Sequence, residues 1–327
     1  MAKKPSRKAK TSKKSAPKKA KSTAKKRILN SSKAMKRPLK KVKTATRVKK
    51  AAKATKRRPA IKRAKPAPIA TRKAPTLDTA LRFLSALPLP PKPLGTRGVE
   101  GQDVLSFTTA KSESVVVGSD ILSFAAGLPE TMRTVITNSM LLAQLAASKK
   151  VGDSEKTTEW YKVYFSVLTT LGWVIQEQGF VEHEESGKDF EVHKAILAVA
   201  TTVFSAGATA LAIVTSTLDA LEKMGDGPWL TIFKKKSQRG KVAQFQVTVV
   251  EPIGDGGVKI SLMAFELEGK NRLTQVLFFK FNSSNVKLRH ASGTVTLDKQ
   301  MMDDLGPAIA TKVRPFQLDF IANIPIE

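Results

Sequence analysis

Residues 241–267, KVAQFQVTVVEPIGDGGVKISLMAFEL, decide the fold. In the first part, Phe245, Val247 and Val249 alternate with polar residues, which is typical of a strand with one buried face. The glycine-rich run GDGG at 254–257 separates this strand from a second apolar run. Glycine-rich residues between two strand patterns predict a β-hairpin. We therefore predict two paired antiparallel strands, at 241–250 and 258–267.

Other strand-like patterns lie on both sides of this hairpin. Period-two runs predict strands at 229–234, 272–281, 285–290, 293–297 and 316–324. The run GDGP at 225–228 precedes them all and breaks the helical pattern upstream. The last hundred residues are therefore predicted to form a mostly antiparallel sheet.

The region before residue 225 has mainly helical spacing, with apolar residues at intervals of three and four. We predict helices at 129–149 and 154–179 and two short strands, at 104–108 and 114–117. Ser119 and Asp120 are suitable helix caps, which predicts a further short helix that ends near Gly127. Helices first and an antiparallel sheet second indicate the α+β class.

The segment Ala195–Leu218 contains no charged residue over 24 positions. That length is sufficient to cross a bilayer. However, seven of its residues are Ala, five are Thr, two are Ser and one is Gly, so it is less apolar than most membrane spans. Two interpretations remain open: a buried central helix that bends at Gly207, or a membrane-inserting segment.

The N-terminal 77 residues have a different composition from the rest of the chain. The chain carries 57 Lys and Arg and 27 Asp and Glu, for a net charge of +30. The first 77 residues hold 31 of the basic residues and no acidic one, which leaves 26 basic and 27 acidic residues for the remainder. With no aromatic residue before Phe83 and few large apolar ones, this tail cannot bury enough surface to fold alone.

A polycationic tail of this kind favours a polyanion as its partner, because each contact with a phosphate releases a condensed counterion. We predict nucleic-acid binding without sequence preference and without a specific role for any single base. The predicted contacts are the clustered basic residues Lys3, Lys4, Lys13, Lys14, Lys18, Lys19, Lys25, Lys26, Arg27, Lys36, Arg37, Lys40, Lys41, Lys49, Lys50, Lys56, Arg57, Arg58, Lys62 and Arg63.

The composition of the tail resembles that of linker-histone tails and bacterial histone-like tails. The resemblance lies in Lys, Ala, Pro, Ser and Thr segments such as AKKP at 2–5, SAPKKA at 15–20 and KPAP at 65–68. It covers only the tail and implies a way of binding, through phosphates, but no common ancestry. Separately, we predict a protein that is cytoplasmic or nucleoid-associated, or nuclear in a eukaryote.

An alternative function is that of an exported or injected effector or toxin. In this hypothesis the basic tail is a loading or targeting signal, and the helical segment Ala195–Leu218 acts on membranes. The short clusters KKR at 25–27 and KRR at 56–58 are typical of import signals. Contact of the tail with acidic membrane surfaces is a third use for the same charges.

The predicted organisation has four parts. Residues 1–75 form the disordered tail, and residues 76–94 form a short helix and a proline-rich linker. Residues 95–224 form the mainly helical region and residues 225–327 the antiparallel region, and 95–327 is long enough to be one domain. The neutral body is predicted to supply a surface for a protein partner or for a homo-oligomer.

The sequence favours a protein that is not an enzyme. It has no Cys and three His, and it lacks the common phosphate-binding, dinucleotide-binding, serine-hydrolase and zinc-peptidase motifs. We therefore predict no catalytic residue, no metal site and no cofactor. A basic cluster at 234–241 remains, and it is either a second phosphate contact or the solvated turn of a hairpin.

Overall fold

The hairpin predicted at 241–267 is confirmed as the centre of the computed structural model. It consists of β7, Val242–Ile253, and β8, Gly257–Gly269, which pair antiparallel along their whole length. Phe245 and Phe265 face each other across the hairpin, and their rings stack with centroids 5.0 Å apart. A pair of this kind contributes about 0.5–1.5 kcal/mol beyond the burial of its area. The glycine-rich turn and the aromatic pair together fix the register of the two strands.

The structure describes residues 75–93, 105–152, 155–177, 181–183, 189–204, 208–273, 276–278, 280–282 and 286–326. These residues belong to one compact unit, Ile69–Glu327. The predicted tail, and with it the first part of the predicted organisation, lies outside the described residues.

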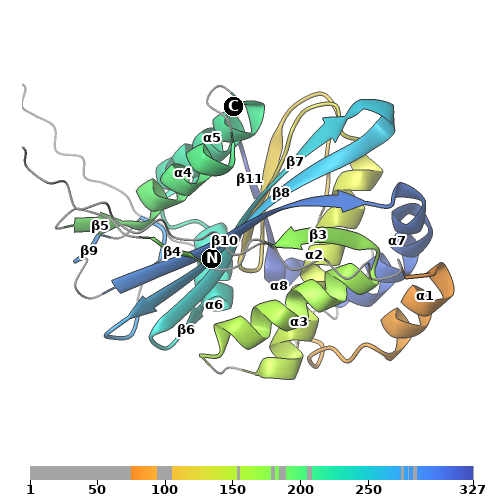
Figure 1. The fold of residues 1–327 in the computed structure, drawn as a ribbon, viewed down its shortest axis with the longest axis horizontal. Coiled ribbons are helices and arrows are strands. Elements are labelled where there is room, and N and C mark those ends of the chain that lie inside the picture. The colour runs from red at the N-terminus through yellow and green to blue at the C-terminus, as the bar shows by residue number, and fades with distance from the viewer. Residues whose placement is uncertain are drawn as a thin grey trace, which may run out of the picture. The chain divides into compact units, whose positions relative to one another are not determined.

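Helices and strands are interspersed along the chain (Figure 1). The helices are α1 Leu77–Ala86, α2 Glu130–Val151, α3 Thr157–Thr170, α4 Val192–Val203, α5 Thr209–Met224, α6 Pro228–Ser237, α7 Lys299–Val313 and α8 Gln317–Phe320. The remaining strands are β1 Glu113–Val117, β2 Asp120–Phe124, β3 Trp173–Glu177, β4 Val181–His183, β5 Asp189–Glu191, β6 Gln238–Arg239, β9 Lys280–Asn282, β10 Val286–Leu297 and β11 Ile321–Ile324.

The main sheet has the strand order β11-β1-β2-β7-β8-β10-β3, with β4 beside β10 and β6 beside β7. All of these pairings are antiparallel except β2 with β7. The predicted α+β class with a mostly antiparallel sheet is therefore confirmed. Most helices precede the long strands, as expected, although β1, β2 and β3 come from the helical half and complete the sheet.

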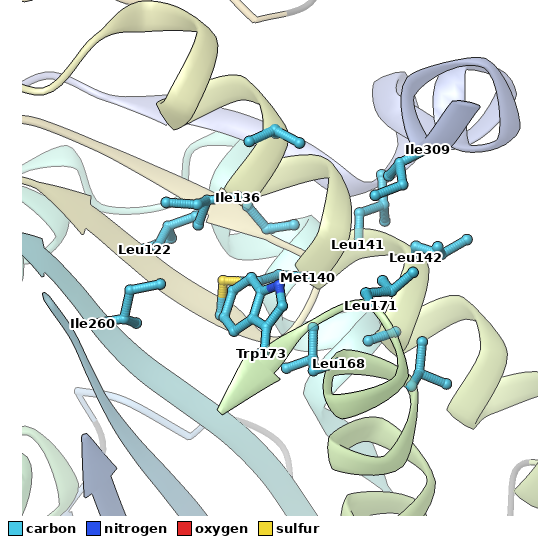
Figure 2. Close-up of a cluster of buried hydrophobic side chains, with 14 of the residues drawn as sticks. Leu122, Ile136, Met140, Leu141, Leu142, Leu168, Leu171, Trp173, Ile260 and Ile309 are labelled. Atoms are coloured by element: carbon cyan, nitrogen blue, oxygen red, sulfur yellow. The ribbon is translucent and has the colours of Figure 1, made fainter. Parts of the chain in front are cut away.

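Helices cover both faces of the sheet (Figure 1). On one face, α1, α2, α3 and α7 pack over a cluster that contains Leu122, Ile260 and Trp173. Figure 2 shows Trp173 among the side chains of Met140 and Leu168. On the other face, α4, α5 and α6 pack over a separate cluster. Alternate residues of each central strand therefore serve two different cores.

Two predicted helices end or disappear at glycines in the left-handed region. Gly118 has a φ of 59° in the turn between β1 and β2, so the predicted helix from Ser119 to Gly127 is wrong and this segment is the strand β2. The predicted helix 154–179 is confirmed only as far as Thr170. Gly172, with a φ of 94°, ends it, and β3 follows. Glycine adopts both conformations at no steric cost, which explains why the chain turns there.

Three predicted strands are wrong over much of their length. Residues 105–108 form no strand, and the described part of 272–281 has strand structure only from Lys280, where β9 begins. In 316–324 only β11 is a strand, because a 3-10 turn and α8 precede it.

Two predictions between these segments are also corrected. The predicted single helix at 195–218 is instead two helices, α4 and α5, of 12 and 16 residues. The predicted strand at 229–234 is the helix α6, which begins with Pro228 at its first position. Proline suits that position because its ring fixes a helical φ and it has no N–H to leave unpaired.

A buried arginine joins α2 to the sheet at the start of β1 and just beyond the end of β2. Arg133 is fully buried, and its guanidinium pairs with Glu113 of β1 at 2.8 Å. It also donates hydrogen bonds to three backbone carbonyl oxygens, those of Lys111, Ala125 and Leu128. Because a buried charge is tolerated only when it is paired and hydrogen-bonded, these contacts hold α2 in one position.

Candidate functional site

The twenty basic residues predicted to contact nucleic acid all lie within residues 1–74, outside the described residues. The described body offers a different candidate, the outer surface of α4 and α5. Its exposed residues are Ala198, Thr201, Thr202, Thr209, Ala212 and Ser216, and its half-buried residues are Leu197, Val203, Leu211 and Thr215. We call these ten residues the neutral face. No charged residue lies between Lys194 and Asp219, so the neutral face spans both helices without a charge.

Three threonine hydroxyls of the neutral face, those of Thr201, Thr202 and Thr215, are hydrogen-bonded within their own helices. Thr201 donates to the carbonyl oxygen of Leu197 at 2.8 Å, and Thr215 donates to that of Leu211 at 2.9 Å. Thr202 bonds in the same way to the preceding turn. A hydroxyl that bonds to its own helix needs no water, so its transfer into an apolar medium leaves no donor unpaired.

The inner surface of α4 and α5 is attached to the sheet mainly by apolar contacts. Residues such as Val199, Phe204, Val214 and Leu218 are buried in the cluster beneath these helices. Among the hydrogen bonds of the described side chains, one group joins α5 to the strands: Thr217 lies 2.8 Å from Ser114 of β1 and 3.2 Å from Ser123 of β2, between oxygen atoms. Packing against the sheet, rather than a polar network, therefore holds this layer.

The layer of α2 and α3, on the other face of the sheet, is attached by hydrogen bonds as well as by apolar contacts. Gln144 of α2 donates to the carbonyl oxygen of Val117 at 2.7 Å and accepts from the backbone N–H of Ser119 at 2.9 Å. The hydroxyl of Tyr161 in α3 lies 2.9 Å from the carbonyl oxygens of Phe245 and Phe265. Removal of α2 and α3 would leave these buried groups unpaired, which costs roughly 1–3 kcal/mol each.

Asp120 of β2 is a buried acid beneath α2 and α3. The hydroxyl of Thr248 lies 3.1 Å from both of its carboxylate oxygens. Burial raises the pKa of Asp120 from 3.8 to about 8, against the smaller, lowering effect of the Thr248 hydrogen bond. Burial also raises the pKa of Tyr161 and of Tyr164 well above the usual value. Burial therefore favours the neutral forms of Asp120, Tyr161 and Tyr164 on this side of the sheet.

The prediction of a hairpin turn at 234–241 is confirmed only for the second half of this basic cluster, where Gly240 and Lys241 form the tight turn that joins β6 to β7. Lys234, Lys235 and Lys236 form the last turn of α6, and Arg239 lies in β6. The ammonium nitrogen of Lys236 lies 3.3 Å from the ring centroid of Phe320. Burial, and then repulsion by Lys235, lower its pKa to about 8. Lys236 therefore packs against the protein instead of extending toward a phosphate in solvent.

No catalytic arrangement is evident in the described residues. His193 lies 3.6 Å from Glu191, between Nε2 and Oε2, and Glu191 also pairs with Lys194 at 2.7 Å. Within the described ranges, no group of three His, Asp or Glu side chains is placed to hold a metal ion. In the same ranges, no helix is both long enough and apolar enough to cross a membrane.

Comparison with known proteins gives no family. No family model matches the sequence, and no curated protein is similar to it. A delta-endotoxin structure is 10% identical, with a TM-score of 0.32 over 64% of this chain and 89% of its own. The Evf virulence factor is 13% identical, with a TM-score of 0.32 over 73% of this chain and 88% of its own.

A third similar structure is the activated Cyt2Ba monomer from Bacillus thuringiensis subsp. israelensis. It is 15% identical, with a TM-score of 0.23 over 38% of this chain and 72% of its own. The structures found thus include an endotoxin and a virulence factor, but the likeness is too low to assign a fold family or a function.

The sequence signals the neutral face through its missing charges, but it does not reveal Asp120 as a buried acid. In the sequence, Asp120 after Ser119 is typical of a helix cap, and only the turn at Gly118 places it in a strand under α2. By comparison, Asp298 does cap a helix: its side chain accepts a hydrogen bond from the backbone N–H of Met301 at the start of α7.

We predict that Asp120 makes stability depend on pH. Its pKa is higher in the folded chain than in the unfolded chain, so the native state holds the proton more tightly and stability falls as pH rises from about 4 to about 8. Asp120→Asn removes this dependence. The free energy of unfolding of the variant relative to the wild type should rise across this window by up to about 1.4 kcal/mol per pH unit, as measured by urea denaturation. A difference that stays constant from pH 4 to pH 9 would contradict the assignment.

Proposed function

We propose that this protein is a non-enzymatic effector that acts on membranes through α4 and α5. In this proposal the neutral face meets the lipid first, and the two helices then leave the sheet and enter one leaflet of the bilayer. The observation that carries the proposal is the pair's combination of an outer surface without charge between Lys194 and Asp219 and an apolar attachment to the sheet. Lipid acyl chains are as apolar as the side chains of the sheet on which α4 and α5 pack. The inner surface of these helices can therefore exchange contact with the sheet for contact with the lipid.

The lengths of the two helices favour entry into one leaflet over a full crossing. At 1.5 Å per residue, α4 is about 18 Å long and α5 about 24 Å, whereas the hydrocarbon core is about 30 Å thick. Lys194 and Asp219 border the uncharged segment and would remain at the level of the headgroups. Thr201 and Thr215 support the same proposal, because their hydroxyls are already paired with their own helices.

The proposal treats the protein as exported or injected, with the basic tail as its loading or targeting signal. The tail carries the whole net positive charge of the chain, because it has 31 basic residues and no acidic residue before Asp78, whereas the remainder has 26 basic and 27 acidic residues. Near an anionic membrane surface, each Lys or Arg contributes about 1 kcal/mol of attraction. The tail would thus raise the concentration of the protein at the membrane surface, where α4 and α5 would enter the bilayer.

A charge placed on the neutral face tests this proposal. Ala212 is exposed in the second turn of α5, where an acidic residue suits the helix dipole, so Ala212→Asp should fold normally. Because an Asp in the bilayer centre costs about 2.5–3.5 kcal/mol, the variant should release dye from phosphatidylcholine–phosphatidylglycerol vesicles about tenfold more slowly than the wild type. The control, Thr311→Asp, adds the same charge to an exposed position of α7 and should leave release unchanged.

Labelling gives a second measurement on the same proteins, because the chain contains no Cys. A polarity-sensitive fluorophore on Ala212→Cys should become brighter and shift to the blue on the vesicles, whereas one on Thr311→Cys should not. Equal release by wild type and Ala212→Asp, with no spectral change at position 212, would refute membrane entry by this layer.

A second candidate function belongs to the tail. We propose that it binds nucleic acid through phosphates and without sequence preference, for which its 31 basic residues without an acidic one are the supporting observation. The body has 26 basic and 27 acidic residues and contributes no net attraction. The same charges serve an acidic membrane or a nucleic acid, so only measurement separates the two.

Deletion of residues 1–75 should abolish binding to a 30-base-pair duplex. For the full chain, the logarithm of the binding constant should fall against the logarithm of salt concentration with a slope of about −0.9 for each phosphate contact, so ten contacts give a slope of about −9. Fluorescence anisotropy at several salt concentrations measures both effects. Retained binding after the deletion, or affinity that does not change with salt, would exclude this role for the tail.

A further inference from the structure

A groove lies between α1, α2 and α3, on the opposite face of the sheet from the neutral face. Its volume is about 650 Å³, which is within the usual range for a small-molecule site. It is lined by Phe83, Leu87, Pro88, Ala146, Lys149, Lys150, Lys162, Val163, Ser166 and Val167. We call it the lysine groove.

Local features of the three helices build the apolar floor of this groove. Phe83 and Leu87 are half-buried on the last turn of α1, where Pro88 then ends the helix. Val163 of α3 is also half-buried and packs at the edge of the same core. These side chains are packed on one side and open on the other, so they offer apolar surface that a ligand can still cover.

The charged residues that line the groove are all lysines. Lys149 and Lys150 occupy the last turn of α2, and Lys162 lies in the middle of α3. All three are exposed, and none forms an ion pair with a carboxylate of the described residues. Lys149 and Lys150 also interact favourably with the helix dipole at the C-terminus of α2. This effect does not account for the presence of Lys162, which lies in the middle of α3.

An apolar floor with a cationic rim is complementary to an anionic amphiphile. A small anion such as phosphate would leave Phe83, Leu87 and Val163 uncovered. A neutral hydrocarbon would gain nothing from the three lysines. A long acyl chain that ends in a carboxylate uses both, and each methylene that it buries strengthens binding about fourfold.

We propose that the lysine groove binds a long-chain fatty acid, with the acyl chain on the floor and the carboxylate at Lys149, Lys150 and Lys162. This site goes beyond the proposed action of α4 and α5 on membranes, because it lies on the other helical layer and shares no residue with the neutral face. The two proposals can therefore fail separately.

The test is a comparison of palmitate with hexadecanol on the full-length chain, each below its solubility limit, by displacement of a fluorescent fatty acid. Palmitate should bind more tightly than the alcohol. The triple variant Lys149→Gln, Lys150→Gln and Lys162→Gln should bind palmitate about tenfold more weakly and lose its preference for the acid. Thermal unfolding of each variant separates this effect from any loss of stability.

The matched control removes the same number of charges elsewhere. Lys223, Lys234 and Lys235 are exposed on α5 and α6, and their triple replacement by Gln should leave binding unchanged. Ser166→Trp places a large ring at an exposed position in the groove and should weaken binding of both the acid and the alcohol.

Three results would overturn the proposal. They are equal affinity for palmitate and hexadecanol, equal weakening by both triple variants, and unchanged binding in Ser166→Trp. Failure of palmitate to bind, with binding of an acidic amphipathic helical peptide instead, would identify the groove as a protein-docking site and would also overturn it.

Discussion

The burial of both faces of the central sheet is the constraint on which the rest of this structure depends. The buried residues of β7 and β8 point either toward α2 and α3 or toward the layer of α4, α5 and α6, whereas the turn end of the hairpin is exposed. Phe245 belongs to the second set, while its neighbour Gln246 lies near Ser119 on the first side. A strand with two buried faces leaves no side free for solvent, so two helical layers are required to complete the fold.

The two layers are held by different forces, and this difference underlies the proposed function. Under α2 and α3, hydrogen bonds from Gln144 and Tyr161 to the backbone of the strands fix the layer, and their loss would leave buried groups unpaired. Under α4 and α5, apolar contacts dominate, with Thr217 as the polar exception. Apolar contacts have no direction, so an acyl chain can replace the sheet as their partner. The layer with fewer polar attachments is therefore the one that we expect to move.

The sequence predicts the long elements well because their signals are local. The alternation at Phe245, Val247 and Val249 and the glycines at 254–257 define the central hairpin, and both are confirmed. Turns that depend on a single glycine are harder to predict. Gly118 and Gly172 redirect the chain into β2 and β3, although the residues that follow them also suit helices. In the same way, α6 has an apolar pattern that is compatible with a short strand, and Pro228 decides in favour of a helix.

The candidate sites could also be predicted from the sequence only in part. The missing charges between Lys194 and Asp219 are visible in the sequence, but their division into two surface helices follows from tertiary packing. The lysine groove joins α1 to α2 and α3 across more than 60 residues, and no local pattern connects them. Tail contacts remain a prediction, since residues 1–74 lie outside the described part of the chain.

The most direct test of the account is to lock α5 onto the sheet. Thr217 and Ser114 have their hydroxyl oxygens 2.8 Å apart, so Thr217→Cys with Ser114→Cys places two thiols within reach of a disulfide in a chain without other Cys. Release of dye from anionic vesicles is then measured for the oxidised protein and for the same sample after reduction, with bond formation checked by mass spectrometry. The account predicts little release when the disulfide is formed and release at the wild-type rate once it is reduced. Equal release in both states would show that α5 does not leave the sheet and would contradict the central claim.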